Sequence, residues 1–186
     1  MIEIVLVNWN SGFQLADVIS SVALYHANLV KSIIIVDNGS TDDSIAHAEA
    51  RVLGLPFILQ LIRNSNNRGF GAACNQGAAL STAEFVLFLN PDTRLFVGSL
   101  SAPNDFFLRL ENADVGIVGI QLVDEQGDVA RSCARFPTVL VLIAQAVGLN
   151  RLPLLRNLTQ AMVEWPHDST RTVDQVIGAF FMIRRS

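Results

Sequence analysis

Short apolar runs alternate along the chain with longer stretches in which apolar residues recur at helical spacing. The short runs are rich in Ile, Val, Leu and Phe and are bounded by Asn, Asp, Gly or Pro, a pattern typical of buried parallel strands. The predicted strands are Ile2–Val7, Ser32–Val36, Phe57–Ile62, Phe85–Leu89 and Val115–Ile120. The predicted helices are Phe13–His26, Asp42–Leu53 and Gly71–Leu80, which follow Ser11, Thr41 and Gly69 as caps or loop residues. This alternation predicts an α/β fold with a mostly parallel central sheet and helices on both faces.

The pattern changes after Ile120, where shorter elements extend the α/β core. Gln121–Asp124, a turn at Glu125–Asp128 and Val129–Ser132 predict a hairpin. The remaining segments are a helix at Leu140–Gly148, an irregular stretch at Asn150–Pro166 and a final strand at Val173–Arg185. No linker or repeat separates these parts, so we expect one domain over residues 1–186.

Four polar loops follow the first four strands in an otherwise apolar chain. They are Asn8–Gly12, Asp37–Asp43, Asn64–Gly71 and Asn90–Arg94. In open parallel sheets, ligands bind beyond the carboxyl ends of the strands. We therefore expect the four loops to converge on one crevice.

Composition narrows the classes of function. The chain is 51% hydrophobic and 16% charged, with a net charge of -4 and no basic run, which argues against disorder and against a nucleic-acid partner. Cys74 and Cys133 lack the spacing of a metal or redox pair and are expected to be reduced. The apolar run Val139–Leu149 is about half of what a membrane span requires, so it predicts a buried or interfacial helix. Without a leader pattern before the first strand, the expected compartment is the cytoplasm.

The segment Asn90-Pro91-Asp92 places a carboxylate directly after the fourth strand. One carboxylate suits Mg²⁺ or Mn²⁺ when diphosphate oxygens and waters supply the other ligands. The alternative interpretation is a strand-terminating turn, and Asp92 considered alone favours that alternative.

Asp37 ends the second strand, where its carboxylate could accept a hydrogen bond from the imide N–H of uracil or thymine. The alternative is a turn with a helix cap supplied by Ser40 or Thr41. Asn8 and Asn10 after the first strand could flank the same base, and Trp9 fits either that role or the core.

The segment Asn67–Asn75 opens a helix with small residues, and its Arg68 could meet the phosphates or the nucleoside of a bound nucleotide. The third position of a G-x-G-x-x-G motif is Cys74 rather than glycine, and neither a P-loop nor a G-x-S-x-G motif occurs. The three histidines form no metal or triad pattern. Dehydrogenase, P-loop and hydrolase functions are therefore not indicated.

Six segments in order resemble the family 2 glycosyltransferases of the GT-A fold, in particular rhamnosyltransferase-like members. They are Val7–Asn10, Val36–Asp42, Asn67–Gly77, Leu89–Asp92, Arg131–Pro137 and Val173–Ala179. The resemblance implies an inverting transfer of a sugar, with rhamnose as the candidate, from a dTDP- or UDP-linked donor. The implied acceptor is a saccharide or a lipid-linked molecule, with peripheral association at the cytoplasmic face of a membrane.

The resemblance also implies residue roles. Asp92 resembles the metal-binding end of the family's DxD motif, with Asn90 in place of the first acid. The other implied contacts are Asn8, Asn10 and Asp37 for the nucleoside, Arg68 and Asn75 for the donor, and Asp174, Gly178 and Ala179 for the sugar and acceptor side.

The catalytic base of the resembled family lies in an acidic segment that we expect beyond Ser186, so no base is assigned here. A divalent metal would stabilise the departing diphosphate while that base deprotonates the acceptor. A non-catalytic nucleotide-sugar-binding fragment or pseudoenzyme is the main alternative. A nucleotidyltransferase is disfavoured because Asn8–Gly12 contains no Lys or Arg.

Overall fold

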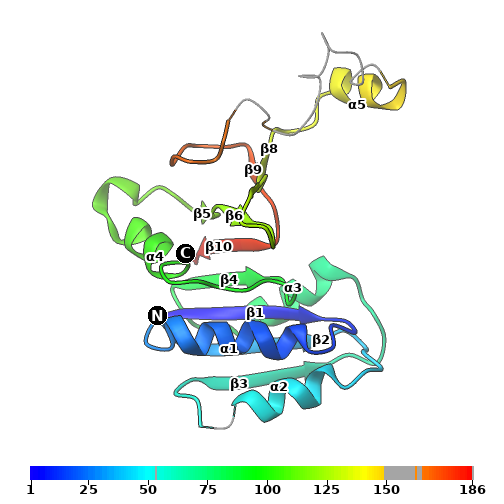
Figure 1. Ribbon diagram of the computed structural model, residues 1–186, viewed down its shortest axis with the longest axis vertical. Helices are drawn as coiled ribbons and strands as arrows, with labels where there is room; N and C mark the ends of the chain where they lie inside the picture. The colour runs from blue at the N-terminus through cyan, green and yellow to red at the C-terminus, as the bar shows by residue number, and fades with distance from the viewer. Residues whose placement is uncertain (53, 149–161, 163–164, 186) are drawn as a thin grey trace. The chain divides into compact units, whose positions relative to one another are not determined.

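The computed structural model describes residues 1–52, 54–148, 162 and 165–185 (Figure 1). These residues form two compact units. The first unit comprises Met1–Val118 together with Gly178–Ser186, and the second comprises Gly119–Ile177. The single-domain organisation stays a prediction.

A six-stranded sheet forms the centre of the first unit, with strand order β3-β2-β1-β4-β10-β5 (Figure 1). Its strands are β1 (Ile2–Asn8), β2 (Val30–Asp37), β3 (Ile58–Arg63), β4 (Phe85–Leu89), β5 (Ile117–Val118) and β10 (Phe180–Arg184). The first four strands pair in parallel, whereas β10 runs antiparallel to both of its neighbours. A mostly parallel α/β sheet is therefore confirmed.

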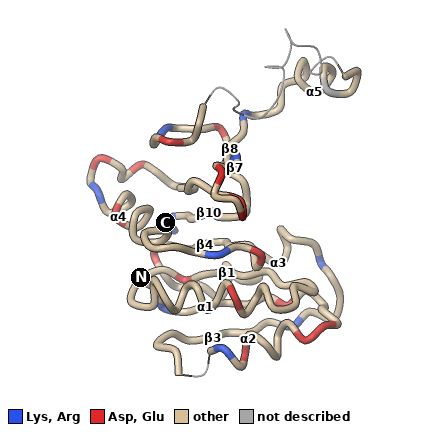
Figure 2. Tube along the Cα trace, viewed as in Figure 1, with Lys and Arg blue, Asp and Glu red and all other residues tan. Residues whose placement is uncertain are grey.

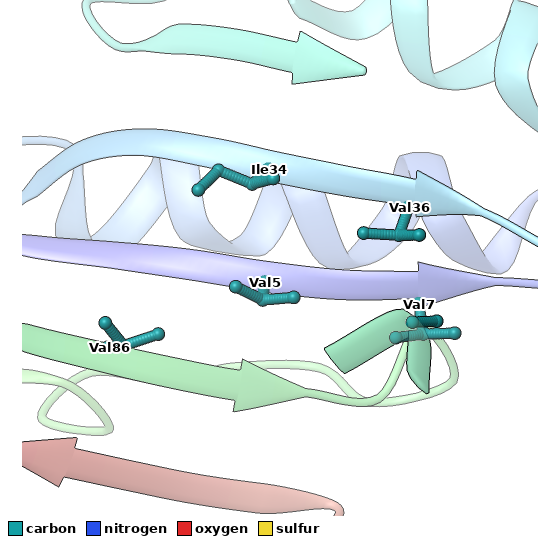
Figure 3. Packing of buried hydrophobic residues seen from close by; sticks show 6 residues of the cluster. Val5, Val7, Ile34, Val36 and Val86 are labelled. Carbon is teal, nitrogen blue, oxygen red and sulfur yellow. The ribbon is translucent and has the colours of Figure 1, made fainter. Parts of the chain in front are cut away.

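Helices cover both faces of this sheet. They are α1 (Gln14–His26), α2 (Ser44–Val52), α3 (Phe70–Leu80) and α4 (Ser101–Leu108), followed by the short 3-10 helix η1 (Leu110–Asn112). On one face, Val5 and Val7 of β1 pack with Ile34 and Val36 of β2 and with α3 through Ala73 (Figure 3). Figure 1 shows α1 and α2 over the opposite face.

The close approach of α3 to the sheet depends on a residue without a side chain. A Cβ at Gly77 would overlap Val5, so glycine lets the helix backbone lie against β1. This packing sets how closely α3 lies against β1 and β2.

Several boundaries differ from the sequence prediction. Strand β3 is an edge strand rather than a buried one, because β2 covers just one of its sides and Ile58 remains 64% exposed. The predicted strand Val115–Ile120 reduces to Ile117–Val118 and pairs antiparallel with β10. The predicted strand Val173–Arg185 divides into β9 (Gln175–Val176) and β10, which belong to different units. Helix α4 and η1 were not predicted.

The second unit contains two small antiparallel pairs and one helix. Strands β6 (Leu122–Val123) and β7 (Val129–Ala130) form the predicted hairpin. Strand β8 (Cys133–Ala134) pairs with β9, and α5 spans Val139–Ala146. Most of the stretch predicted to be irregular, Asn150–Pro166, lies outside the described residues. Cys74 and Cys133 are free thiols, as predicted.

Among the described residues, no helix is both long and apolar enough to cross a bilayer.

A buried carboxylate in β1 fixes the turn that leads from α3 into β4. One oxygen of Glu3, which is 2% exposed, accepts hydrogen bonds from Ser81 Oγ at 2.5 Å, Thr82 N at 2.7 Å and Ala83 N at 3.0 Å. Its other oxygen lies 3.2 Å from Lys31 Nζ. Burial alone raises the pKa of Glu3, but these hydrogen bonds outweigh burial and lower the pKa from 4.5 to about 2.

We expect the free energy of unfolding to fall as the pH decreases from 4.5 to 2, because the folded protein resists protonation of Glu3 more than the unfolded chain does. The loss should be about 3 kcal/mol. Glu3→Gln should cost a similar amount at neutral pH and flatten the acid limb of the profile. Urea denaturation at several pH values measures both effects. Glu111→Gln, at an exposed acid, is the matched control and should leave the profile unchanged.

Candidate functional site

A cavity of about 330 Å³ lies at the carboxyl ends of the parallel strands in the first unit. All four polar loops contribute to its wall, so the predicted convergence of the loops is observed. The lining residues are Val7, Trp9, Asn10, Ser11, Gln14, Asn38, Asn67, Phe70, Asn90, Pro91 and Asp92. Trp9 is 59% exposed at this wall and is therefore not a core residue.

Asn8 holds the first two loops together from beneath the cavity. It pairs with Asp37 across β1 and β2, and its side chain is fully buried. The amide nitrogen lies 3.1 Å from Asp37 Oδ1, 2.9 Å from Ser40 Oγ and 2.8 Å from Ser44 Oγ, while its carbonyl oxygen accepts from Ser11 Oγ. Asn8 was predicted to contact the nucleoside, but the structure places it below the surface as a support for the loops.

Asp37 combines a supporting contact with a free oxygen. Its Oδ1 accepts from Asn8 and from the backbone N–H of Ser40, at 3.3 Å. Within the described part of the chain, no hydrogen bond reaches Oδ2. Asp37 is 7% exposed and is not itself among the lining residues, although the next residue, Asn38, is. One carboxylate oxygen therefore supports the turn, as the alternative interpretation has it, and the other has no hydrogen-bond partner among the described residues.

The same two loops meet again at the surface. Asn10 adopts a positive φ of 54°, which asparagine tolerates, and its Oδ1 accepts from Thr41 N at 2.8 Å. Asp42 accepts from Gly12 N at 2.8 Å and from Ser44 N at 3.3 Å, at the start of α2. Asp42 therefore caps α2, in place of the predicted caps Ser40 and Thr41.

Asn38 connects the second loop to the third, and sequence reasoning did not single it out. Its side chain is 2% exposed, and its Oδ1 accepts from Arg68 N at 3.0 Å and from Asn64 Nδ2 at 3.2 Å. Its Nδ2 donates to Asn67 Oδ1 at 2.8 Å. The signal in the sequence was an asparagine directly after a strand, opposite a loop with three further asparagines.

The fourth loop carries Asp92 and is attached along α1. Asn90 O accepts from Thr93 N and Oγ1, which confirms the turn expected at this position. Further along the loop, Ser21 Oγ of α1 accepts from Leu95 N at 3.1 Å. His26 Nε2 lies 2.8 Å from Phe96 O and must donate to it, and burial lowers the pKa of His26.

Asp92 lies in a turn, is exposed to solvent and lines the cavity. No hydrogen bond or ion pair of the described residues engages its carboxylate. Within residues 1–52, 54–148, 162 and 165–185, no group of three His, Cys, Asp or Glu side chains could hold a metal. The residues present therefore fit a cation that takes one protein carboxylate and completes its coordination with ligand oxygens and water, as Mg²⁺ and Mn²⁺ do.

The remaining predicted residues lie at different places. Arg68 and Asn75 are exposed and are not among the lining residues. Ala179 O accepts from Asn90 N at 3.1 Å, and a Cβ at Gly178 would lie 3.8 Å from the ring of Phe70, so this pair borders the cavity wall. Asp174 belongs to the second unit, where it accepts from Phe136 N at 3.0 Å.

Several solved structures share this architecture. A mannosyltransferase from Pyrobaculum calidifontis in complex with GDP-Man and Mn²⁺ aligns with a TM-score of 0.59 and 16% identity, covering 67% of this chain and 36% of that one. TarS residues 1–349 from S. aureus align with a TM-score of 0.62 and 16% identity, covering 98% of this chain and 46% of that one. The same enzyme in complex with UDP-GlcNAc gives 0.58 and 19% identity, with coverage of 78% and 42%. The chain thus spans less than half the length of each.

The sheet, its helices and these likenesses define the GT-A glycosyltransferase fold. Residues 3–128 match Glycosyl transferase family 2, which is more than half of the chain. The chain therefore belongs to glycosyl transferase family 2. No curated protein sequence matches it.

The second loop approaches the third so closely that one position requires glycine. Gly39 has a φ of +81°, and a Cβ there would lie 2.9 Å from backbone atoms of Asn66. Gly54 has nearly the same φ, +84°, with no atom within 4 Å of its Cβ position. The two glycines therefore differ in steric contact and share the same backbone conformation.

We expect Gly39→Ala to lower the free energy of unfolding by about 1 to 2 kcal/mol more than Gly54→Ala, because both replacements incur the left-handed backbone penalty and the former adds a clash. Thermal or urea denaturation measures the difference. An equal fall in the free energy of unfolding for both variants would contradict this expectation. It would show that the second and third loops can move apart without loss of stability.

Proposed function

We propose that the chain binds a uridine- or thymidine-diphosphate sugar through a divalent cation at Asp92, as the donor domain of an inverting glycosyltransferase. The observation that carries this proposal is the composition of the cavity wall. The wall contains amide, hydroxyl and aromatic side chains with one carboxylate, and no Lys or Arg. A diphosphate beside Asp92 would be repelled unless a cation lay between them.

Bound Mg²⁺ or Mn²⁺ would stabilise the charge that develops on the departing diphosphate. The chain's own residues orient the donor. Asp37 Oδ2 would accept the imide N–H of the base, and Trp9 and Phe70 would cover apolar surfaces of the ligand. Asn90, which replaces the first acid of the family's motif, would offer a neutral side chain, so the cation would depend on Asp92.

Two predicted donor residues lie outside the cavity wall: Arg68 is exposed on the third loop and Asn75 on α3. They would meet phosphate or sugar oxygens of a ligand that extends beyond the cavity. Gly178 and Ala179 would border the sugar, and Asp174 is assigned to the acceptor side by its place in the resembled motif. Rhamnose remains the candidate sugar, and a saccharide or lipid-linked molecule the candidate acceptor.

Calorimetry with UDP and dTDP, each titrated with and without Mn²⁺, tests the cation site. For the unmodified chain, Mn²⁺ should tighten binding on the order of tenfold or more, because it removes the repulsion between diphosphate and carboxylate. Asp92→Asn should abolish this metal dependence. Asp105→Asn, at an exposed acid of α4, is the matched control and should retain it.

Equal metal dependence in Asp92→Asn and the unmodified chain would contradict the assigned role of Asp92. Transfer is tested separately, by incubating the protein with a dTDP- or UDP-sugar and following release of the nucleoside diphosphate in the presence of acceptors. Metal-dependent binding without transfer, in the chain and in any longer gene product, would favour the non-catalytic alternative.

Asp37→Asn tests recognition of the base while preserving the Oδ1 contact with Asn8. The substitution replaces the free acceptor oxygen by an amide donor, so UDP affinity should fall by about tenfold or more. CDP, whose cytosine N3 is an acceptor, should lose less affinity or gain some. Competition between UDP and CDP measures this ratio. An unchanged ratio would show that Asp37 does not contact the base.

A further inference from the structure

One edge of the central sheet is open to a further strand. Strand β3 ends the sheet, and among the described residues it pairs with β2 alone (Figure 1). It has six residues, whereas β5 at the opposite edge has two. Edge strands in natural proteins are usually short or interrupted by a charge, a proline or a bulge. Between Ile58 and Ile62, β3 contains no proline and no charged residue, and Figure 2 shows this stretch in tan.

The main-chain groups at this edge follow from the pairing with β2. Asn64 N donates to Asp37 O at 2.8 Å, so the main chain of Asn64 faces β2. Successive residues of a strand direct their main-chain groups to alternate sides, so Gln60 bonds toward β2 as well. Leu59 and Leu61 therefore direct their N–H and C=O groups outward. Within the described part of the chain, no strand receives them.

The sequence of β3 identifies the strand that fits this edge. Residues 58–62 read Ile-Leu-Gln-Leu-Ile, which is the same in both directions about Gln60. Two copies can therefore pair antiparallel about a two-fold axis at Gln60. Ile58 then lies opposite Ile62 of the second copy, and Leu59 lies opposite Leu61. Such apolar cross-strand pairs stabilise a sheet, and Leu59 and Leu61 would exchange about four main-chain hydrogen bonds across the axis.

The polar residues of β3 also suit a second copy. Gln60 interrupts the apolar run, and among the described residues its side-chain amide has no hydrogen-bond partner. An amide has both donors and an acceptor, so two Gln60 side chains can bond each other at the axis. Arg63 is the one charged residue of β3. The arginines of the two copies would lie about 20 Å apart, beyond the range of strong repulsion in salt.

We propose that two copies of the chain pair through their β3 edges, antiparallel about Gln60, and join their sheets into one. This pairing does not rest on the proposed donor site, because no residue of β3 lines the cavity. The two strands run in opposite directions, so the two cavities would open at opposite edges of the joined sheet. Pairing occupies the β3 edge of both copies, so the assembly ends at two.

Sedimentation velocity of the full chain, from about 1 to 100 µM, tests the proposal. The unmodified chain should shift reversibly from one copy to two as its concentration rises. Gln60→Lys and Gln60→Glu should each weaken the pairing at least about tenfold, because like charges then meet at the two-fold axis. Circular dichroism establishes that each variant folds.

An equimolar mixture of the two Gln60 variants distinguishes the proposed pairing from a local defect. Opposite charges would then meet at the axis, so the mixture should form two-copy species although each variant alone does not. Damage to β3 in either variant would not be repaired by mixing. Gln126→Lys and Gln126→Glu, at an exposed glutamine of the second unit, are the matched controls. Each should pair like the unmodified chain.

Three results would overturn the proposal. The first is an unmodified chain that stays a single copy up to about 100 µM or grows beyond two copies. The second is undiminished pairing in Gln60→Lys and Gln60→Glu, which would place the contact elsewhere on the chain. The third is a mixture of these variants that stays as single copies, since Gln60 would then not lie at the axis.

Discussion

The cavity at the carboxyl ends of the parallel strands depends on buried asparagine amides that join loops from different strands. Parallel strands bring the loops to one edge of the sheet, but the polar groups of the loops still need hydrogen-bond partners. Asn8 supplies donors and an acceptor to the first two loops, and Asn38 does the same between the second and third. Because an unsatisfied buried polar group costs about 1 to 3 kcal/mol, these contacts favour one arrangement of the loops over many. The arrangement of the cavity wall is thereby fixed by the chain's own hydrogen bonds.

Amides satisfy hydrogen bonds without adding charge, and this determines the electrostatics of the cavity. A network of Lys and Asp side chains would also have joined the loops, but it would have placed cations at the cavity wall. Among the described residues that line the cavity, Asp92 is the one charged side chain. If a diphosphate binds there, as proposed, the charge that neutralises it would come from a cation that enters with the ligand or from a residue outside the wall, such as Arg68.

The sequence predicted the parallel strands and the polar loops because burial on both faces of a sheet demands continuous apolar runs, and such runs can be recognised in the sequence. Whether a strand lies at the edge of the sheet cannot be recognised in the same way. Ile58 belongs to an apolar run and is exposed because, among the described residues, β3 pairs with β2 alone and forms the edge of the sheet. The reversal of β10 depends on its pairing with β4, which local residue patterns do not encode. The supporting roles of Asn8 and Asn38 depend on contacts between residues about 30 positions apart, so spacing placed Asn8 in the binding site and overlooked Asn38.

The match to glycosyl transferase family 2 ends at residue 128, before α5 begins. The residues that line the cavity, and the asparagines that join its loops, lie within the matched residues. The hydrogen bond from Asn90 N to Ala179 O, at 3.1 Å, joins the fourth loop to the residue before β10, which lies beyond the match. The position of the loop that carries Asp92 therefore depends on residues from both inside and outside the matched range.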